Sequence, residues 1–166
     1  MAEVLFITPT EMTDTTILSG NVDVDNYLYC ILDYQIRVVE PILGTLLYEK
    51  IKTDLEASTL SGLYLELYTN YIKPITKFGS VASYIETASY MVANGGIFKH
   101  APENKEVVDI SEVSRLAQKY NSTADTYIIR LKKWFCDNGS SITEYTTDQD
   151  GVTPKKNIRT IAGWKL

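Results

Sequence analysis

Residues 109–139 decide the fold of this chain, and they read DISEVSRLAQKYNSTADTYIIRLKKWFCDNG. Apolar side chains recur along the stretch at spacings of three and four residues, which is the period of a helix with one buried face. They are Val113, Leu116, Tyr120, Ala124, Tyr127, Leu131 and Trp134. The opening Asp-Ile-Ser-Glu predicts a capping box, and Asn138-Gly139 predicts the end. The stretch therefore predicts one continuous helix of about six turns.

Further helices are predicted on the N-terminal side. Thr8-Pro9-Thr10-Glu11 has the sequence of a capping box with proline at the first helical position, which predicts a helix over about 9–19. Residues 26–40, NYLYCILDYQIRVVE, predict a second helix that Pro41 ends or kinks. Its apolar residues form two neighbouring stripes, one of Tyr27, Ile31, Tyr34 and Val38 and one of Leu28, Leu32 and Val39. So wide an apolar face predicts burial on more than one side.

Three more helices complete the prediction. They are 45–56 (TLLYEKIKTDLE), 62–72 (GLYLELYTNYI, with a strand as the alternative) and about 75–93, which Asn94-Gly95-Gly96 ends. We expect Ile97 and Phe98 to pair with Val107 and Val108 as a short β-hairpin. The predicted fold is all-α, a compact bundle of about five helices with this hairpin. A helical domain over 1–137 is followed by an extended C-terminal arm over 138–166.

Composition places the chain among ordinary globular proteins. Its 166 residues are 45% apolar and 22% charged, which suits one domain with a buried core. Residues 1–70 carry eleven acidic and three basic side chains, whereas residues 71–166 carry ten acidic and thirteen basic ones. We therefore expect two surfaces of opposite sign, and the acidic balance argues against sequence-specific DNA binding. Because neither a secretory signal nor an apolar run of roughly 18–20 residues is found, we expect a soluble protein that does not enter a membrane.

The sequence offers little chemistry. His100 is the only histidine and has no Cys or Ser partner nearby, so we expect a surface or packing residue. Cys30 and Cys136 show no metal-ligand spacing, which predicts two reduced thiols. Asp23 and Asp25 precede a helix, where carboxylates offset the helix dipole. Since no metal-binding loop or glycine-rich nucleotide motif occurs either, we expect no enzyme activity, no metal and no cofactor.

Two features leave alternatives open. The twelve tyrosines are spread over the predicted helices, where they serve core packing or, as we favour, protein–protein interfaces. Arg130, Lys132 and Lys133 lie near the end of the last helix, where they either contact phosphate or form a solvated helix end, the more common arrangement.

The C-terminal stretch differs from everything before it. Residues 150–166 read DGVTPKKNIRTIAGWKL, with four basic side chains and no acidic one after Asp150. Pro154 and Gly163 disfavour a helix, so we expect an extended path. We predict a docking arm that reaches an acidic surface through Pro154, Lys155, Lys156, Ile158, Arg159, Ile161, Trp164 and Leu166.

Three stretches carry a resemblance to a known family. They are FITPTEMTD (6–14), NVDVDNYLYCILDYQIRVVEPILGTLLYEKI (21–51) and SVASYIETASYMVANGGIFKHAP (80–102), before the long final helix. Over about residues 4–136 the chain resembles the head–tail connector proteins of tailed bacteriophages, also called adaptor or ring proteins. It is most similar to those of phages that infect Bacteroidetes, including crAss-like phages.

The resemblance implies a small helical bundle that forms a homo-oligomeric ring of typically about twelve copies at the head–tail junction of the virion, after assembly in the host cytoplasm. Such a ring contacts the portal protein and the next tail or ring component, and genomic DNA passes through it without specific binding. We expect the loop with Ile97, Phe98, His100 and Pro102 to reach the neighbouring subunit. The alternatives are a stopper or other tail-completion ring protein, and a small DNA-packaging accessory protein.

Overall fold

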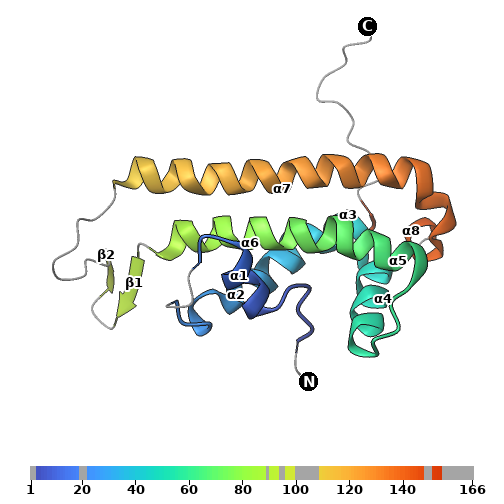
Figure 1. Ribbon diagram of the computed structural model, residues 1–166, viewed down its shortest axis with the longest axis horizontal. Coiled ribbons are helices and arrows are strands. Elements are labelled where there is room, and N and C mark those ends of the chain that lie inside the picture. The colour runs from blue at the N-terminus through green and yellow to red at the C-terminus, as the bar shows by residue number, and fades with distance from the viewer. Residues whose placement is uncertain are drawn as a thin grey trace, which may run out of the picture.

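Three layers of helices make up the structure, a computed structural model that describes residues 3–18, 22–88, 90–93, 96–99, 109–147 and 151–154. The middle layer is α6 (Lys73–Ala88). Figure 1 shows α7 (Ile110–Asn138) on one side of it, and α1 (Pro9–Thr15) and α2 (Asp25–Tyr34) on the other. The all-α bundle predicted from the sequence is thereby confirmed.

The remaining helices extend or connect these layers. They are η1 (Gln35–Val39), α3 (Glu40–Leu43), α4 (Thr45–Glu56), α5 (Gly62–Leu67), η2 (Tyr68–Ile72), η3 (Gly139–Ser141) and α8 (Thr143–Thr146). Of these, η1 and η2 are π-helical and η3 is a 3-10 turn. α2, η1 and α3 form one continuous helix, and α5, η2 and α6 form another. The segment 62–72 is thus a helix rather than a strand, and it continues into α6.

Both π-helical turns precede a proline at the same spacing. η1 ends two residues before Pro41, and η2 ends two residues before Pro74. Proline lacks an N–H, and its ring clashes with the carbonyl four residues back in a regular α-helix. The wider π turn changes the hydrogen-bond partner by one residue, as in the bond from the Glu40 N–H to the Gln35 carbonyl. The helix predicted to end or kink at Pro41 therefore continues as far as Gly44, whose φ is +81°.

The two predicted capping boxes have different outcomes. At α1 the box is present: the Glu11 N–H donates to Thr8 Oγ1 (3.2 Å) and the Thr8 N–H donates to Glu11 Oε2 (3.1 Å). At α7 the N-cap is Asp109, as predicted, but its carboxylate accepts a hydrogen bond from the Ser111 hydroxyl (2.6 Å) instead of capping the helix. A short polar side chain next to an N-cap offers the carboxylate a competing local partner.

A short hairpin is present, with a different partner strand from the predicted one. β1 (Tyr90–Ala93) pairs antiparallel with β2 (Gly96–Lys99), so that Ile97 lies opposite Val92 and Phe98 opposite Met91. The prediction that helix continues to about residue 93 is therefore wrong, since α6 ends at Ala88. Asn-Gly between two apolar runs is a strong signal for a two-residue hairpin turn, and it was interpreted as a helix stop. Val107 and Val108 lie outside the described residues.

The middle layer approaches α2 most closely at one glycine. The buried Tyr34 places its ring against Gly79 of α6, where a methyl group would stand only 1.9 Å from Tyr34 Cζ. Glycine is needed at this position because any side chain would occupy the space of the ring. Burial, with the negative charge of Asp125 on α7, raises the pKa of Tyr34 to about 12.

The N-terminal segment is part of the core. Phe6 and Ile7 are buried. The Phe6 N–H donates to Oε1 of the buried Gln35 on η1 (2.7 Å), and Gln35 Nε2 donates to the Val4 carbonyl (3.1 Å). The Tyr68 hydroxyl on η2 donates to the Phe6 carbonyl (2.9 Å). Side chains of the two π-helical turns thus bind backbone groups that burial would otherwise leave unpaired.

The predicted boundary between a helical domain and an extended arm at residue 138 is wrong. Residues 139–147 form η3 and α8, and their Ile142 and Tyr145 are buried in the main core. The Tyr145 ring stacks on Phe135 of α7 with centroids 4.0 Å apart. Because the segment is rich in Ser, Thr and Gly, its two apolar anchors are hard to recognise in the sequence. The helical body includes them.

Candidate interaction surfaces

The C-terminal segment is anchored where α3 meets α4. The Thr45 N–H donates to the Val152 carbonyl (3.0 Å), and the Val152 N–H donates to Thr45 Oγ1 (3.0 Å). The Thr45 hydroxyl in turn donates to Glu40 Oε1 (2.8 Å). Gly151 lies so close that a methyl group there would stand 2.8 Å from Thr45 Oγ1. Pro154 is buried, so the anchored body extends at least to this residue.

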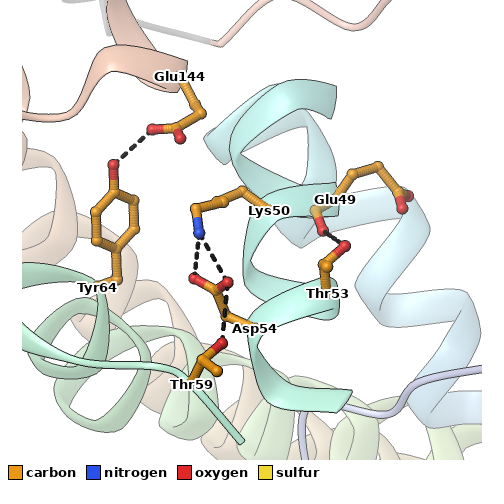
Figure 2. A network of polar contacts seen from close by, with 7 residues as sticks. All are labelled: Glu49, Lys50, Thr53, Asp54, Thr59, Tyr64 and Glu144. Atoms are coloured by element: carbon orange, nitrogen blue, oxygen red, sulfur yellow. Dashed lines mark hydrogen bonds and ion pairs between the residues drawn. The ribbon is translucent and has the colours of Figure 1, made fainter. Parts of the chain in front are cut away.

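Polar contacts lie where α8 meets α4 and α5, and one of them joins α8 to α5 (Figure 2). Lys50 Nζ lies 2.7 Å from both carboxylate oxygens of Asp54, which also accepts a hydrogen bond from the Thr59 hydroxyl (3.3 Å). The Tyr64 hydroxyl donates to Glu144 Oε2 on α8 (2.6 Å). Burial and the Glu144 charge raise the pKa of Tyr64 to about 12, so the hydroxyl remains a donor at neutral pH. The Tyr64–Glu144 bond helps to fix the base from which the C-terminal segment starts.

One apolar face of the α2–η1 helix is only partly covered by the described residues. Val24, Leu28, Leu32 and Ile36 recur every four residues, which places them along one side of the helix. We call these four residues the α2 stripe. Leu28 is 37% exposed, Ile36 is 49% exposed, Val24 is exposed and Leu32 is half-buried. Single exposed apolar residues are ordinary, but a row of four on one helix face is typical of an interaction surface.

Charge is segregated between the outer layers. Residues 9–34, which include α1 and α2, contain five acidic and no basic side chains. Of these, Asp14, Asp23, Asp25 and Asp33 are exposed. α7, on the opposite side of α6, contains five basic and three acidic side chains. The charge asymmetry along the sequence therefore becomes an asymmetry between two outer layers.

Aromatic rings line the contact between α6 and α7. Tyr127 stacks on Phe78 with centroids 5.9 Å apart, and Trp134 follows one heptad later on the same helix. Arg130 lies over the Tyr127 ring at 5.4 Å, and Lys77 lies over the Phe78 ring at 4.9 Å. Rings and cations at these separations attract each other, so both cations have partners within the chain.

Many tyrosines serve the fold. Among the described residues, Tyr27, Tyr34, Tyr48 and Tyr145 are buried. Several hydroxyls donate hydrogen bonds within the chain, including Tyr27 to the Pro9 carbonyl, Tyr29 to the Thr87 hydroxyl, Tyr64 to Glu144 and Tyr68 to the Phe6 carbonyl. Core packing thus explains rings for which an interface was the favoured interpretation. An interface role stays a prediction for rings such as Tyr29, which is 54% exposed.

Burial and local contacts shift the pKa values of two reactive side chains in opposite directions. Burial raises the pKa of the Cys30 thiol, whereas the thiolate is the reactive form. Cys30 is buried and Cys136 is exposed, and both are free. For Glu11, burial alone would raise the pKa, but its bonds to Lys73 and to the Thr8 N–H lower it overall.

Neither a metal centre nor a membrane span is found in the part of the chain that the structure describes. No three His, Cys, Asp or Glu side chains there are grouped to hold a metal ion, and no helix there is long and apolar enough to cross a bilayer. Asp23 Oδ1 accepts a hydrogen bond from the Asp25 N–H (3.2 Å) at the start of α2, and the expected effect of the two carboxylates on the helix dipole stays a prediction.

The sequence-predicted site residues fall on both sides of the boundary of the described residues. Pro154 is buried against the body, and Ile97 and Phe98 belong to β2. The other arm residues and the rest of the predicted interface loop lie outside: Lys155, Lys156, Ile158, Arg159, Ile161, Trp164, Leu166, His100 and Pro102. Their roles stay predictions.

Sequence reasoning missed the α2 stripe as a surface. The wide apolar face of residues 26–40 is visible in the sequence and was assigned to burial on more than one side. One side of that face packs on the body through Tyr27, Ile31 and Tyr34, while the Leu28 side is left accessible. The width of the apolar face indicated that two of its sides need cover, but not that the described residues leave one side partly exposed.

The fold and these surfaces define a small helical-bundle protein with several candidate contact surfaces. Residues 39–155 match the model of a family of unknown function, DUF6712. Because the match covers more than half of the chain, the protein belongs to this family. The matched region includes the anchor at Val152, whereas Leu28 and Trp164 lie outside it. No curated protein and no solved structure matches the chain.

Proposed function

We propose that this protein is a structural component of a bacteriophage virion, a ring protein beneath the portal that joins capsid to tail and extends the DNA channel. The resemblance of residues 4–136 to head–tail connector proteins motivates the proposal. The all-α bundle fits the fold that the resemblance implies.

The observation that carries the proposal is that each copy bears two unlike docking elements. One is the exposed α2 stripe, and the other is the basic C-terminal segment that follows the anchor at Thr45. Closed rings are built from head-to-tail contacts in which two different surfaces of each subunit meet. An α2 stripe and a basic C-terminal segment in the same chain could supply the two different surfaces of a head-to-tail contact.

Charge segregation supports the channel role. The exposed acids of α1 and α2 would repel phosphates if this layer lined a channel, so that DNA would slide without binding. α7, with its basic excess, would then face away from DNA, toward other protein components.

The test is the mass of the full-length protein, alone and mixed with the portal protein encoded by the same genome. A ring of defined stoichiometry on the portal, seen by native mass spectrometry and electron microscopy, is the expected result. Its position along the particle axis separates an adaptor from a stopper. A protein that stays monomeric and does not bind the portal would overturn the proposal.

The basic end of α7 favours a second candidate, a small DNA-packaging accessory protein. Arg130 and Lys133 are exposed there and could contact phosphate. A DNA affinity that falls steeply with added salt would support this candidate. Absence of binding at low salt would reject it.

A further inference from the structure

The α2 stripe is an apolar surface without a partner in the described body. Val24, Leu28, Leu32 and Ile36 span twelve residues at about 1.5 Å per residue, which gives a row about 18 Å long. The neighbouring apolar stripe of the same helix is buried, with Tyr27 and Ile31 at 0% exposure. The width of the apolar face thus exceeds what the chain's own body covers.

The arm beyond Pro154 has a matching pattern. Ile158, Ile161 and Trp164 recur every three residues. The basic residues Lys156, Arg159 and Lys165 are spaced by three and then six residues, so they follow the same three-residue period. A polyproline-II segment has three residues per turn, so it would place the three apolar side chains on one side and the three basic ones on the next. Neither the helical nor the strand period sorts these residues in this way.

The two elements also agree in length. Six residues separate Ile158 from Trp164, which span about 19 Å at about 3.1 Å per residue. The α2 stripe is about 18 Å long. The twelve residues that follow Pro154 reach about 40 Å when extended, which is enough to cross to a neighbouring molecule.

Charge complements the apolar match. Asp25 is exposed on the helix that carries the stripe, and Asp23 is exposed just before it, whereas the exposed Asp33 is paired with Arg37 (2.8 Å). The arm has no acidic residue after Asp150. An arm with one apolar and one basic side would therefore meet apolar and acidic side chains on this one helix.

We propose that the α2 stripe of one copy binds residues 155–166 of the next copy, with Ile158, Ile161 and Trp164 on the stripe and the basic side chains toward Asp23 and Asp25. The inference rests on the proposed ring function, because a stripe and an arm in every copy generate a head-to-tail series that closes into a ring. Binding of the arm to the stripe of its own chain is the competing outcome.

The experiment uses two full-length variants that each destroy one half of the contact. Leu28→Gln with Ile36→Gln removes the stripe, and Ile158→Ser with Trp164→Ser removes the arm anchors. Ile129→Ser is the matched control, since Ile129 is the most exposed large apolar residue on α7, at 64%. Circular dichroism verifies that each variant is folded.

Each double variant alone should associate at least about tenfold more weakly than the wild type, by sedimentation velocity, whereas Ile129→Ser should associate normally. Mixed together, the two double variants should form a one-to-one heterodimer, because one intact stripe and one intact arm remain. Added salt should weaken the heterodimer. A mixture that stays monomeric, or a stripe variant that associates normally, would overturn the inference.

If the wild type is monomeric in isolation, a synthetic peptide of residues 154–166 replaces the second copy. It should bind the arm variant saturably, and bind the arm variant carrying Leu28→Gln and Ile36→Gln at least about tenfold more weakly. A scrambled peptide of the same composition is the control, and equal binding by both peptides would overturn the inference. A change in Trp164 fluorescence on stripe substitution at concentrations without association would indicate binding within one chain and would also overturn it.

Failure of this inference is distinguishable from failure of the proposed function. A ring on the portal that survives Leu28→Gln with Ile36→Gln would refute the stripe contact and leave the ring function standing. A heterodimer from the two variants, without any binding of the wild type to the portal, would leave the contact standing and refute the portal role.

Discussion

The α2–η1 helix has two apolar faces, of which one is buried and the other is partly exposed. The inner face, with Tyr27, Ile31 and Tyr34, is buried against α1 and α6, whereas the outer face keeps Leu28 and Ile36 accessible. Both faces are apolar and both follow the helical period. The difference teaches that the helical period identifies the apolar faces, while the arrangement of neighbouring helices decides which face is buried.

The largest effect is expected where the inner face meets α6. Gly79→Ala should destabilise the fold by about 3 kcal/mol, because a methyl group would stand 1.9 Å from Tyr34 Cζ. Urea unfolding measures the loss. A double-mutant cycle with Tyr34→Ala is the control, since removal of the ring should make the Gly79→Ala change nearly neutral. Additive effects would show that burial of the inner face does not depend on the contact between Gly79 and Tyr34.

A smaller loss is expected at the buried amide of η1. Gln35→Leu should cost about 2 kcal/mol, because it leaves the buried Phe6 N–H and the Val4 carbonyl without their bonds. Gln118→Leu on the exposed side of α7 is the matched control and should change little. If the two substitutions cost the same in thermal unfolding, the side-chain clamp on the N-terminal segment does not stabilise the protein.

Alkaline pH should weaken the fold, in part through the Tyr34 ring on the inner face. Burial raises the pKa of Tyr34, Tyr64 and Tyr68 from an ordinary value of 10 to about 12, with the Glu144 charge adding to the effect at Tyr64. The folded state therefore holds these protons more tightly than the unfolded state. Their contribution is complete below about pH 10 and is lost as pH rises toward 12. Denaturant midpoints between pH 8 and pH 12 measure the decline, and Tyr34→Phe should make it shallower. An unchanged slope would contradict the assignment.

The smallest effect on stability is expected on the outer face. Leu28→Gln with Ile36→Gln should alter the free energy of unfolding by no more than about 1 kcal/mol, because these side chains remain 37% and 49% exposed in the folded chain. The same variant should lose association if the stripe is an interface. A loss of stability as large as that of Gln35→Leu would mean that the outer face is covered within the monomer.

Local sequence signals succeeded where the chemistry is local. The Thr8–Glu11 capping box and the long helix through Leu131 follow from neighbours within a few residues. Asn94-Gly95 has two local meanings, helix stop and hairpin turn, and only the pairing of Val92 with Ile97 decides between them. Ser111 likewise diverts Asp109 from the predicted box through a hydrogen bond that composition does not reveal.

The C-terminal segment was predicted least well, for a similar reason. Ser, Thr and Gly around Ile142 and Tyr145 read as an irregular arm, but Phe135 provides a stacking partner for the Tyr145 ring. Val152 is held by Thr45, which is distant in sequence. Contacts between residues so far apart in sequence produce no local pattern, so only the structure shows where the anchored segment ends.

The sequence by itself determined the all-α class, the long final helix, the excess of apolar surface on residues 26–40 and the basic character of residues 155–166. These properties depend on composition and period, which short-range geometry converts directly into helices and faces. Only the tertiary structure decided that Tyr34 lies over Gly79, that the C-terminal segment returns to Thr45 and that the α2 stripe stays accessible. Each of these depends on where distant elements meet, because burial is a property of the packed molecule.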